Sequence, residues 1–165
     1  MIQPRDLERL KELPVDVCVQ PANQVIDITM LDACLGGRTG WAYAYRSMLD
    51  AGLRVLFSSD SPVCNPSPLM GIHALVTRQR RDGTPPGGWH PEQRVTVEEA
   101  IAGYTIVPAR AYGLDEDLGS ITPGKRADMV MLDQDITEID PSAIPDTRVD
   151  MTDRKSTRLN SSHYS

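Results

Sequence analysis

Short apolar runs alternate with amphipathic stretches over the first half of the sequence. The run Leu53–Phe57 is bounded by turn residues, which predicts a buried strand. Val15–Val19 predicts a short strand, and Pro4–Leu13 carries leucines at helical spacing, which predicts an amphipathic helix before it. Between the strands, residues 31–49 are interrupted by glycines and predict a loop that leads into a helix ending near Gly52. This order is typical of a βαβ unit and indicates an α/β fold with a parallel sheet.

The pattern beyond the second strand predicts two helices separated by a long loop. Ser67 is placed to cap a helix over Leu69–Arg80, and the Gly- and Pro-rich segment Arg81–His90 predicts a mobile surface loop. Thr96 and Glu99 have the spacing of a capping box at the start of a further helix. The acids at this helix start are therefore explained by capping rather than by catalysis.

A carboxylate stands directly after the strand predicted at Leu53–Phe57. Asp60 follows two serines and precedes Ser61 and Pro62, which close a turn. In an α/β barrel the loops at the carboxyl ends of the strands form the catalytic face, so an acid here is a candidate for chemistry. The same residues are also an ordinary way to stop a strand, with the carboxylate accepting hydrogen bonds from nearby backbone amides. The spacing alone leaves both interpretations open.

Several motifs in matching order resemble those of a known enzyme family. The segment around Asp60 resembles the end of the barrel in the metal-dependent amidohydrolase superfamily, and its closest likeness is amidohydrolase family 3, the branch with N-substituted formamide deformylase-like enzymes. Val17–Pro21 is similar to the seventh strand of that family, and residues 119–128 (GSITPGKRAD) resemble its return to a small β domain. The resemblance extends from residue 2 to about residue 152.

The resemblance implies an α/β fold, the C-terminal portion of a TIM (β/α)8 barrel plus part of a small β-sandwich domain. Residues 1–115 would form the last strands and helices of the barrel, and residues 116–152 part of the β domain, in which the apolar run Asp128–Asp133 predicts a buried strand. Residues 153–163 resemble the translation of a sequencing-library adapter, although a genuine polar, disordered terminus fits the composition equally well. Residues 153–165 are therefore not expected to contribute to the fold or to the site.

The same resemblance implies that the parent protein is a metal-dependent hydrolase, which cleaves a non-peptide amide-type C–N bond through a metal-activated water. Asp60 would bind the divalent metal, zinc by this resemblance, or take the proton of the attacking water. The family's histidine ligands are expected upstream of Met1, so we expect this fragment to be inactive alone. A non-catalytic barrel relative that serves binding or assembly is an alternative, and a self-standing α/β binding module is another.

Polar residues near the strand ends are candidates for contacts with a small amide-like substrate. Gln20, at the end of the first strand, could point its amide at substrate or bond neighbouring backbone. Asn23 stands where relatives in the family often carry a histidine, and Arg38 could reach a carbonyl or an acidic group from the following loop. His73 is interpreted as a packing or solvent-facing residue rather than a metal ligand, and His90 as an exposed loop residue.

Charge and cysteine content limit the expected partners. The sequence has 17 basic and 23 acidic residues, a net charge of −6, which argues against nucleic acid or an anionic membrane as a partner. The sequence has no apolar stretch long enough to cross a bilayer. Its 3 cysteines lack metal-type spacing and are consistent with reduced thiols and a cytoplasmic location. These observations leave the oligomeric state open.

Overall fold

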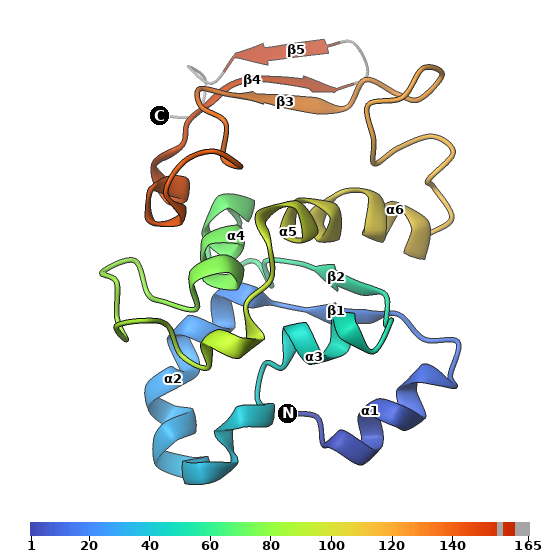
Figure 1. Ribbon diagram of the computed structural model, residues 1–165. Helices are drawn as coiled ribbons and strands as arrows, with labels where there is room; N and C mark the ends of the chain where they lie inside the picture. The colour runs from blue at the N-terminus through green and yellow to red at the C-terminus, as the bar shows by residue number, and fades with distance from the viewer. Residues whose placement is uncertain (155–156, 161–165) are drawn as a thin grey trace.

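The computed structural model describes residues 1–154 and 157–160 (Figure 1). Strands β1 and β2 lie among helices, and the sheet of β3, β4 and β5 lies at the other end of the molecule. Over the described ranges, no helix combines the length and apolar character needed to cross a membrane. The elements are α1 (Pro4–Lys11), β1 (Val17–Val19), α2 (Pro21–Leu35), η1 (Gly36–Trp41), α3 (Tyr45–Asp50), β2 (Val55–Phe57), α4 (Pro68–Thr77), η2 (Pro91–Gln93), α5 (Val97–Tyr104), α6 (Ile106–Ala111), β3 (Met129–Leu132), η3 (Pro141–Asp146), β4 (Val149–Arg154) and β5 (Thr157–Asn160).

The strands predicted in the first region form a parallel pair, which confirms the βαβ order. β1 pairs with β2 so that Cys18 lies opposite Leu56, and each strand is shorter than its predicted range. Helix α3 leads into β2 and ends where predicted, because Gly52 turns the chain with a φ of 77° that other residues rarely adopt. The ends of β1 and β2 therefore lie side by side, as parallel pairing requires.

The segment after β1 differs from the prediction. α2 occupies Pro21–Leu35, so the loop predicted from residue 31 begins inside a helix. The apolar side chains of α2 are not confined to one face, since Ile28 is buried whereas Ile26 and Met30 are exposed, and this hides the helical period. Pro21 directly after the strand is a signal of a helix start, because proline is favoured at the first helical position.

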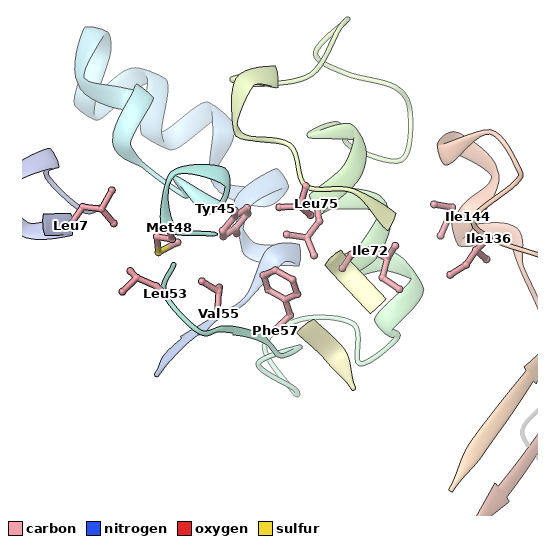
Figure 2. Close-up of a cluster of buried hydrophobic side chains, with 12 residues drawn as sticks. Leu7, Tyr45, Met48, Leu53, Val55, Phe57, Ile72, Leu75, Ile136 and Ile144 are labelled. Atoms are coloured by element: carbon pink, nitrogen blue, oxygen red, sulfur yellow. The ribbon is translucent and has the colours of Figure 1, made fainter. Parts of the chain in front are cut away.

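The hydrophobic core lies between β2 and the helices that pack on it (Figure 2). Phe57 is only 5% exposed, and its ring centroid lies 6.2 Å from that of Tyr45 and 5.7 Å from that of Tyr104. Ile136 and Ile144 join the same cluster from the segment after β3. The buried members of the cluster are Leu7, Tyr45, Met48, Leu53, Val55, Phe57, Ile72, Leu75, Val95, Ala100, Ile136 and Ile144.

The capping box predicted at the start of α5 is confirmed. Glu99 N donates to Thr96 Oγ1 (3.2 Å), and Thr96 N donates to Glu99 Oε2 (2.8 Å). Glu99 also pairs with Arg46 of α3, which joins two helices that pack on β2. The hydrogen bond from Arg46 lowers the pKa of the Glu99 carboxyl, and the bonds with Thr96 act in the same direction. Glu99 therefore serves the fold.

Helix α4 ends at Thr77, before the predicted end at Arg80. Arg78 leaves the helix with a left-handed φ of 60°, and its buried side chain donates from Nε to Trp89 O and from Nη1 to Tyr43 O, both at 2.9 Å. Burial lowers the pKa of the Arg78 guanidinium to about 10. Trp89 is buried too, so the far end of the segment predicted as a mobile surface loop is packed into the protein.

The strand predicted as buried at Asp128–Asp133 is exposed, which corrects that prediction. β3 pairs antiparallel with β4, but Val130 is 58% and Met131 51% exposed. The reason is that the main neighbour of this strand is β4, and Leu132 at its end is the β3 residue that packs against the core among the described residues.

Part of the segment 153–165, which was not expected to contribute to the fold, has strand structure. Asp153 and Arg154 end β4, and residues 157–160 form β5, which pairs antiparallel with β4. The hydrogen-bonding edge of β4 accounts for this pairing. The rest of that segment, residues 155–156 and 161–165, lies outside the described residues.

Candidate active site

The polar residues at the carboxyl ends of β1 and β2 meet at one edge. Gln20 follows β1 directly, and residues 58–60 follow β2. Ser58 N donates to Val19 O at 3.0 Å, which extends the parallel pairing beyond β2. The two strand ends are thus held together where the sequence places its candidate side chains.

Side chains at this edge lie on the face of the strands opposite the core. Val55 and Phe57 pack into the core, and successive side chains of a strand point to opposite faces. On the other face, Gln20 Nε2 donates to Ser58 Oγ at 3.2 Å, and Cys18 Sγ lies 3.6 Å from the same oxygen. Gln20 therefore bonds a neighbouring side chain rather than the backbone, and Cys18 and Ser58 are additional members of the site.

Asp60 is exposed and lies in the turn just beyond this group. Its backbone has a φ of 58°, a left-handed conformation that Asp adopts more readily than most residues, and its carbonyl accepts from Val63 N at 2.7 Å. The carboxylate accepts a hydrogen bond from Asn23 Nδ2 at 3.3 Å. Within residues 1–154 and 157–160, no backbone amide donates to this carboxylate, so the strand-stopping interpretation lacks the hydrogen bonds it requires.

Asn23 connects Asp60 to a buried cysteine. It lies in the first turn of α2, and its Oδ1 accepts a hydrogen bond from the Cys64 thiol. Burial raises the pKa of that thiol, and the charges of Asp60 and Asp27 raise it further, so Cys64 is a neutral donor at pH 7. The structure thus brings Asn23 to Asp60 across 37 residues of sequence.

The remaining sequence candidates lie outside this group. Arg38 is exposed in η1, and within the part of the chain that the structure describes its side chain makes no hydrogen bond or ion pair. His73 is buried in α4, and burial, followed by the charge of Arg81, lowers its pKa, which fits the packing role predicted for it. His90 was predicted to be exposed, but it is half-buried because Nε2 bonds Thr39 Oγ1 at 2.9 Å.

The residues at the strand ends can supply one ligand, Asp60, to a metal site. Asp60 Oδ2 accepts from Asn23, whereas Oδ1 receives no hydrogen bond from any described residue, and an exposed carboxylate oxygen is a suitable ligand for a divalent metal. Over the described ranges, no three His, Cys, Asp or Glu side chains gather closely enough to hold an ion. These residues can therefore contribute Asp60 to a metal centre, but they do not form a complete one.

Sequence reasoning missed Cys18, Ser58 and Cys64. Cys18 and Gln20 are two apart, as are Ser58 and Asp60, so the period of a strand could have placed each pair on one face. No comparable signal exists for Cys64, because its contact with Asn23 spans 41 residues and depends on the packing of α2.

Comparisons with known proteins show which proteins this chain is similar to. The chain is 43% identical over 93 residues to N-substituted formamide deformylase from Arthrobacter pascens, which is 56% of this chain and 17% of that protein. It is 32% identical over 136 residues to Protein LONG AFTER FAR-RED 3 from Arabidopsis thaliana, 79% of this chain and 22% of that protein. The chain therefore spans about a fifth of the length of these curated relatives.

A solved structure and a family model extend the match over most of the chain. The crystal structure of an uncharacterized metal-dependent hydrolase from Pyrococcus horikoshii superimposes with a TM-score of 0.73 at 27% identity, covering 86% of this chain and 29% of that one. The model of the family described as "Amidohydrolase family" matches residues 1–154. The chain belongs to the amidohydrolase family.

Proposed function

We propose that this chain is part of a metal-dependent hydrolase that cleaves a non-peptide amide-type C–N bond, with Asp60 in its active site. The observation that carries the proposal is the placement of Asp60. Its carboxylate lies beyond the carboxyl end of β2, is exposed, and is held by a side chain rather than by its own turn. An acid placed in this way is free to take part in chemistry.

The fold supports this assignment. β1 and β2 are parallel, and their core-side residues pack against helices. The other face carries Leu56 and, at the strand ends, the polar side chains of Gln20 and Ser58. We infer that they are the last two strands of a (β/α)8 barrel and that this second face points toward its axis, since active sites of such barrels lie at the carboxyl ends of the strands. The sheet of β3, β4 and β5 would then belong to an accompanying β domain.

Asp60 can act as a base and then as an acid. A divalent metal, zinc by family resemblance, would supply a bound water of lowered pKa and polarise the substrate carbonyl. Asp60 then accepts a proton from the attacking water as the new C–O bond forms, and returns it to the leaving nitrogen as the C–N bond breaks. The carbonyl compound and the amine leave with all atoms of the substrate and the water accounted for.

Gln20 is the better placed of the substrate-contact candidates. Its amide nitrogen is fixed on Ser58 Oγ, which leaves the amide oxygen able to accept a hydrogen bond from substrate. Asn23 uses both ends of its amide within the protein, on Asp60 and on Cys64. Contact between substrate and Arg38 stays a prediction, since Arg38 lies outside the group of residues around Asp60.

The test uses the protein from the complete reading frame that contains this segment. Its hydrolysis of N-substituted formamides and related amides is measured beside metal content, and Asp60→Asn is expected to lower kcat at least about 100-fold, because acid–base catalysis contributes on the order of 10²–10⁴. Asp150→Asn, at an exposed position of β4, is the matched control and should retain full activity. The 165-residue chain assayed alone is expected to be inactive.

Two results would contradict the proposal. Retention of turnover by Asp60→Asn, with an unchanged circular dichroism spectrum, would remove Asp60 from the mechanism. A complete protein that lacks both bound metal and turnover would instead favour the non-catalytic relative that serves binding or assembly.

A further inference from the structure

We propose that Asn23 is a positioning residue that aims the Asp60 carboxylate, and that the buried Cys64 thiol reinforces the direction of the Asn23 amide by donating to its oxygen. This inference rests on the proposed function, because it assigns to Asp60 the role described above. It replaces the substrate contact that the sequence suggested for Asn23.

Asn23 is itself held in place before it reaches Asp60. Its backbone nitrogen donates to Gln20 O at 3.2 Å, so the first turn of α2 is tied to the residue that ends β1. The side chain is half-buried and extends to the turn after β2, where Nδ2 lies 3.3 Å from Asp60 Oδ2. The contact therefore links the ends of both strands through a side chain with little freedom.

The direction of the amide follows from the chemistry of its neighbours. An amide donates only through nitrogen and accepts through oxygen, and a carboxylate only accepts, whereas a thiol can donate weakly or accept weakly. With Oδ1 on the Cys64 thiol and Nδ2 on Asp60, both contacts are satisfied. The reversed amide would set its oxygen against a carboxylate oxygen, so Asp60 sets the direction of the amide. The Cys64 thiol donates to Oδ1 in that direction and so reinforces it.

This arrangement leaves the other carboxylate oxygen available. Oδ2 is occupied by Asn23, whereas Oδ1 receives no hydrogen bond from the residues the structure describes. Among those residues Asn23 is the one side chain that restrains the exposed carboxylate. Loss of Asn23 should let the carboxylate turn, which affects the chemical step more than substrate binding, since small misplacements of a catalytic group cost up to about 100-fold.

The test uses variants of the complete protein, assayed for kcat, KM and zinc affinity. Asn23→Ala is expected to lower kcat about 10- to 100-fold with KM within about twofold, and to weaken zinc binding, since outer hydrogen-bond partners of metal ligands contribute about 10- to 100-fold in affinity or activity. Cys64→Ala should lower kcat in the same direction, and Cys64→Ser should restore it, because a hydroxyl also donates to Asn23 Oδ1. Cys34→Ala, at the exposed end of α2, is the matched control.

The outcomes separate this inference from the proposed function. A rise in KM at constant kcat for Asn23→Ala would make Asn23 a substrate contact, and equal activities of Cys64→Ala and Cys64→Ser would exclude orientation by the thiol. Either result overturns this inference while loss of activity in Asp60→Asn still supports the hydrolase. A protein without zinc and without turnover would overturn both. If Asn23→Ala does not fold, the Cys64→Ala and Cys64→Ser pair decides by itself.

Discussion

Strands β2 and β3 are both short and apolar, yet their surroundings are opposite. Val55, Leu56 and Phe57 of β2 are all buried, whereas the first three residues of β3 are all exposed. Helices α3 and α5 pack on β2, while the main neighbour of β3 is the strand beside it. An apolar run therefore predicts a strand, but its burial depends on a covering layer elsewhere in the chain.

The largest expected contrast between the two strands is in their contribution to stability. Phe57→Ala should lower the free energy of unfolding by about 3–5 kcal/mol, because it removes a ring packed between Tyr45 and Tyr104 and leaves a cavity. Val130→Ala should lower it by less than about 0.5 kcal/mol, as is usual at exposed positions. Urea denaturation followed by circular dichroism measures both. Similar losses for the two variants would show that β3 is covered in solution.

A second contrast concerns how tightly the layer over β2 is packed. A Cβ atom at Gly103 of α5 would lie 2.3 Å from Phe57 Cδ2, so Gly103→Ala should destabilise by about 1–3 kcal/mol. Helix propensity alone would favour alanine by about 1 kcal/mol, so the sign of the change distinguishes packing from propensity. Gly37→Ala is the control, because nothing lies within 4 Å of its added Cβ. Stabilisation by Gly103→Ala would mean that the ring of Phe57 can move aside at little cost in free energy.

The same contrast explains what the sequence could predict of the fold. Features that depend on neighbours in sequence were predictable, such as the strand at Leu53–Phe57 and the capping box of Thr96 and Glu99. The exposure of β3 was not, because it depends on which elements pack against it. Helix α2 was missed for a related reason, since its apolar residues do not mark a single buried face.

In the candidate site, too, some features could be predicted from the sequence and others could not. Asp60 could be singled out because parallel strands end at one edge, and Gln20 follows the neighbouring strand for the same reason. The contact of Asn23 with Asp60 and Cys64 spans 37 and 41 residues and is set by how α2 packs. A sequence shows which residues could bear chemistry, but their partners depend on tertiary structure.

The smallest expected effect concerns the ion pair that joins the helices covering β2. Glu99 of α5 pairs with Arg46 of α3, and this hydrogen bond lowers the Glu99 pKa from its usual 4.5. A carboxyl whose pKa is lower in the folded state stabilises the protein above its unfolded pKa, and this stabilisation is lost as the pH falls through the folded value. Glu99→Gln should therefore cost about 1 kcal/mol or less at pH 7, in the range of partly exposed pairs, and this cost should shrink below about pH 4.

Urea denaturation of the unmodified chain and of Glu99→Gln at several pH values measures that difference. Glu98→Gln is the matched control, since its exposed side chain lies beside Glu99 in the same helix turn. A difference between Glu99→Gln and the unmodified chain that is the same at pH 7 and pH 3 would mean that the Glu99 side chain acts through packing and hydrogen bonding rather than charge. Helices α3 and α5 would then be held on β2 by their apolar contacts. The difference in stability between β2 and β3 would in that case come from burial of apolar side chains and not from this ion pair.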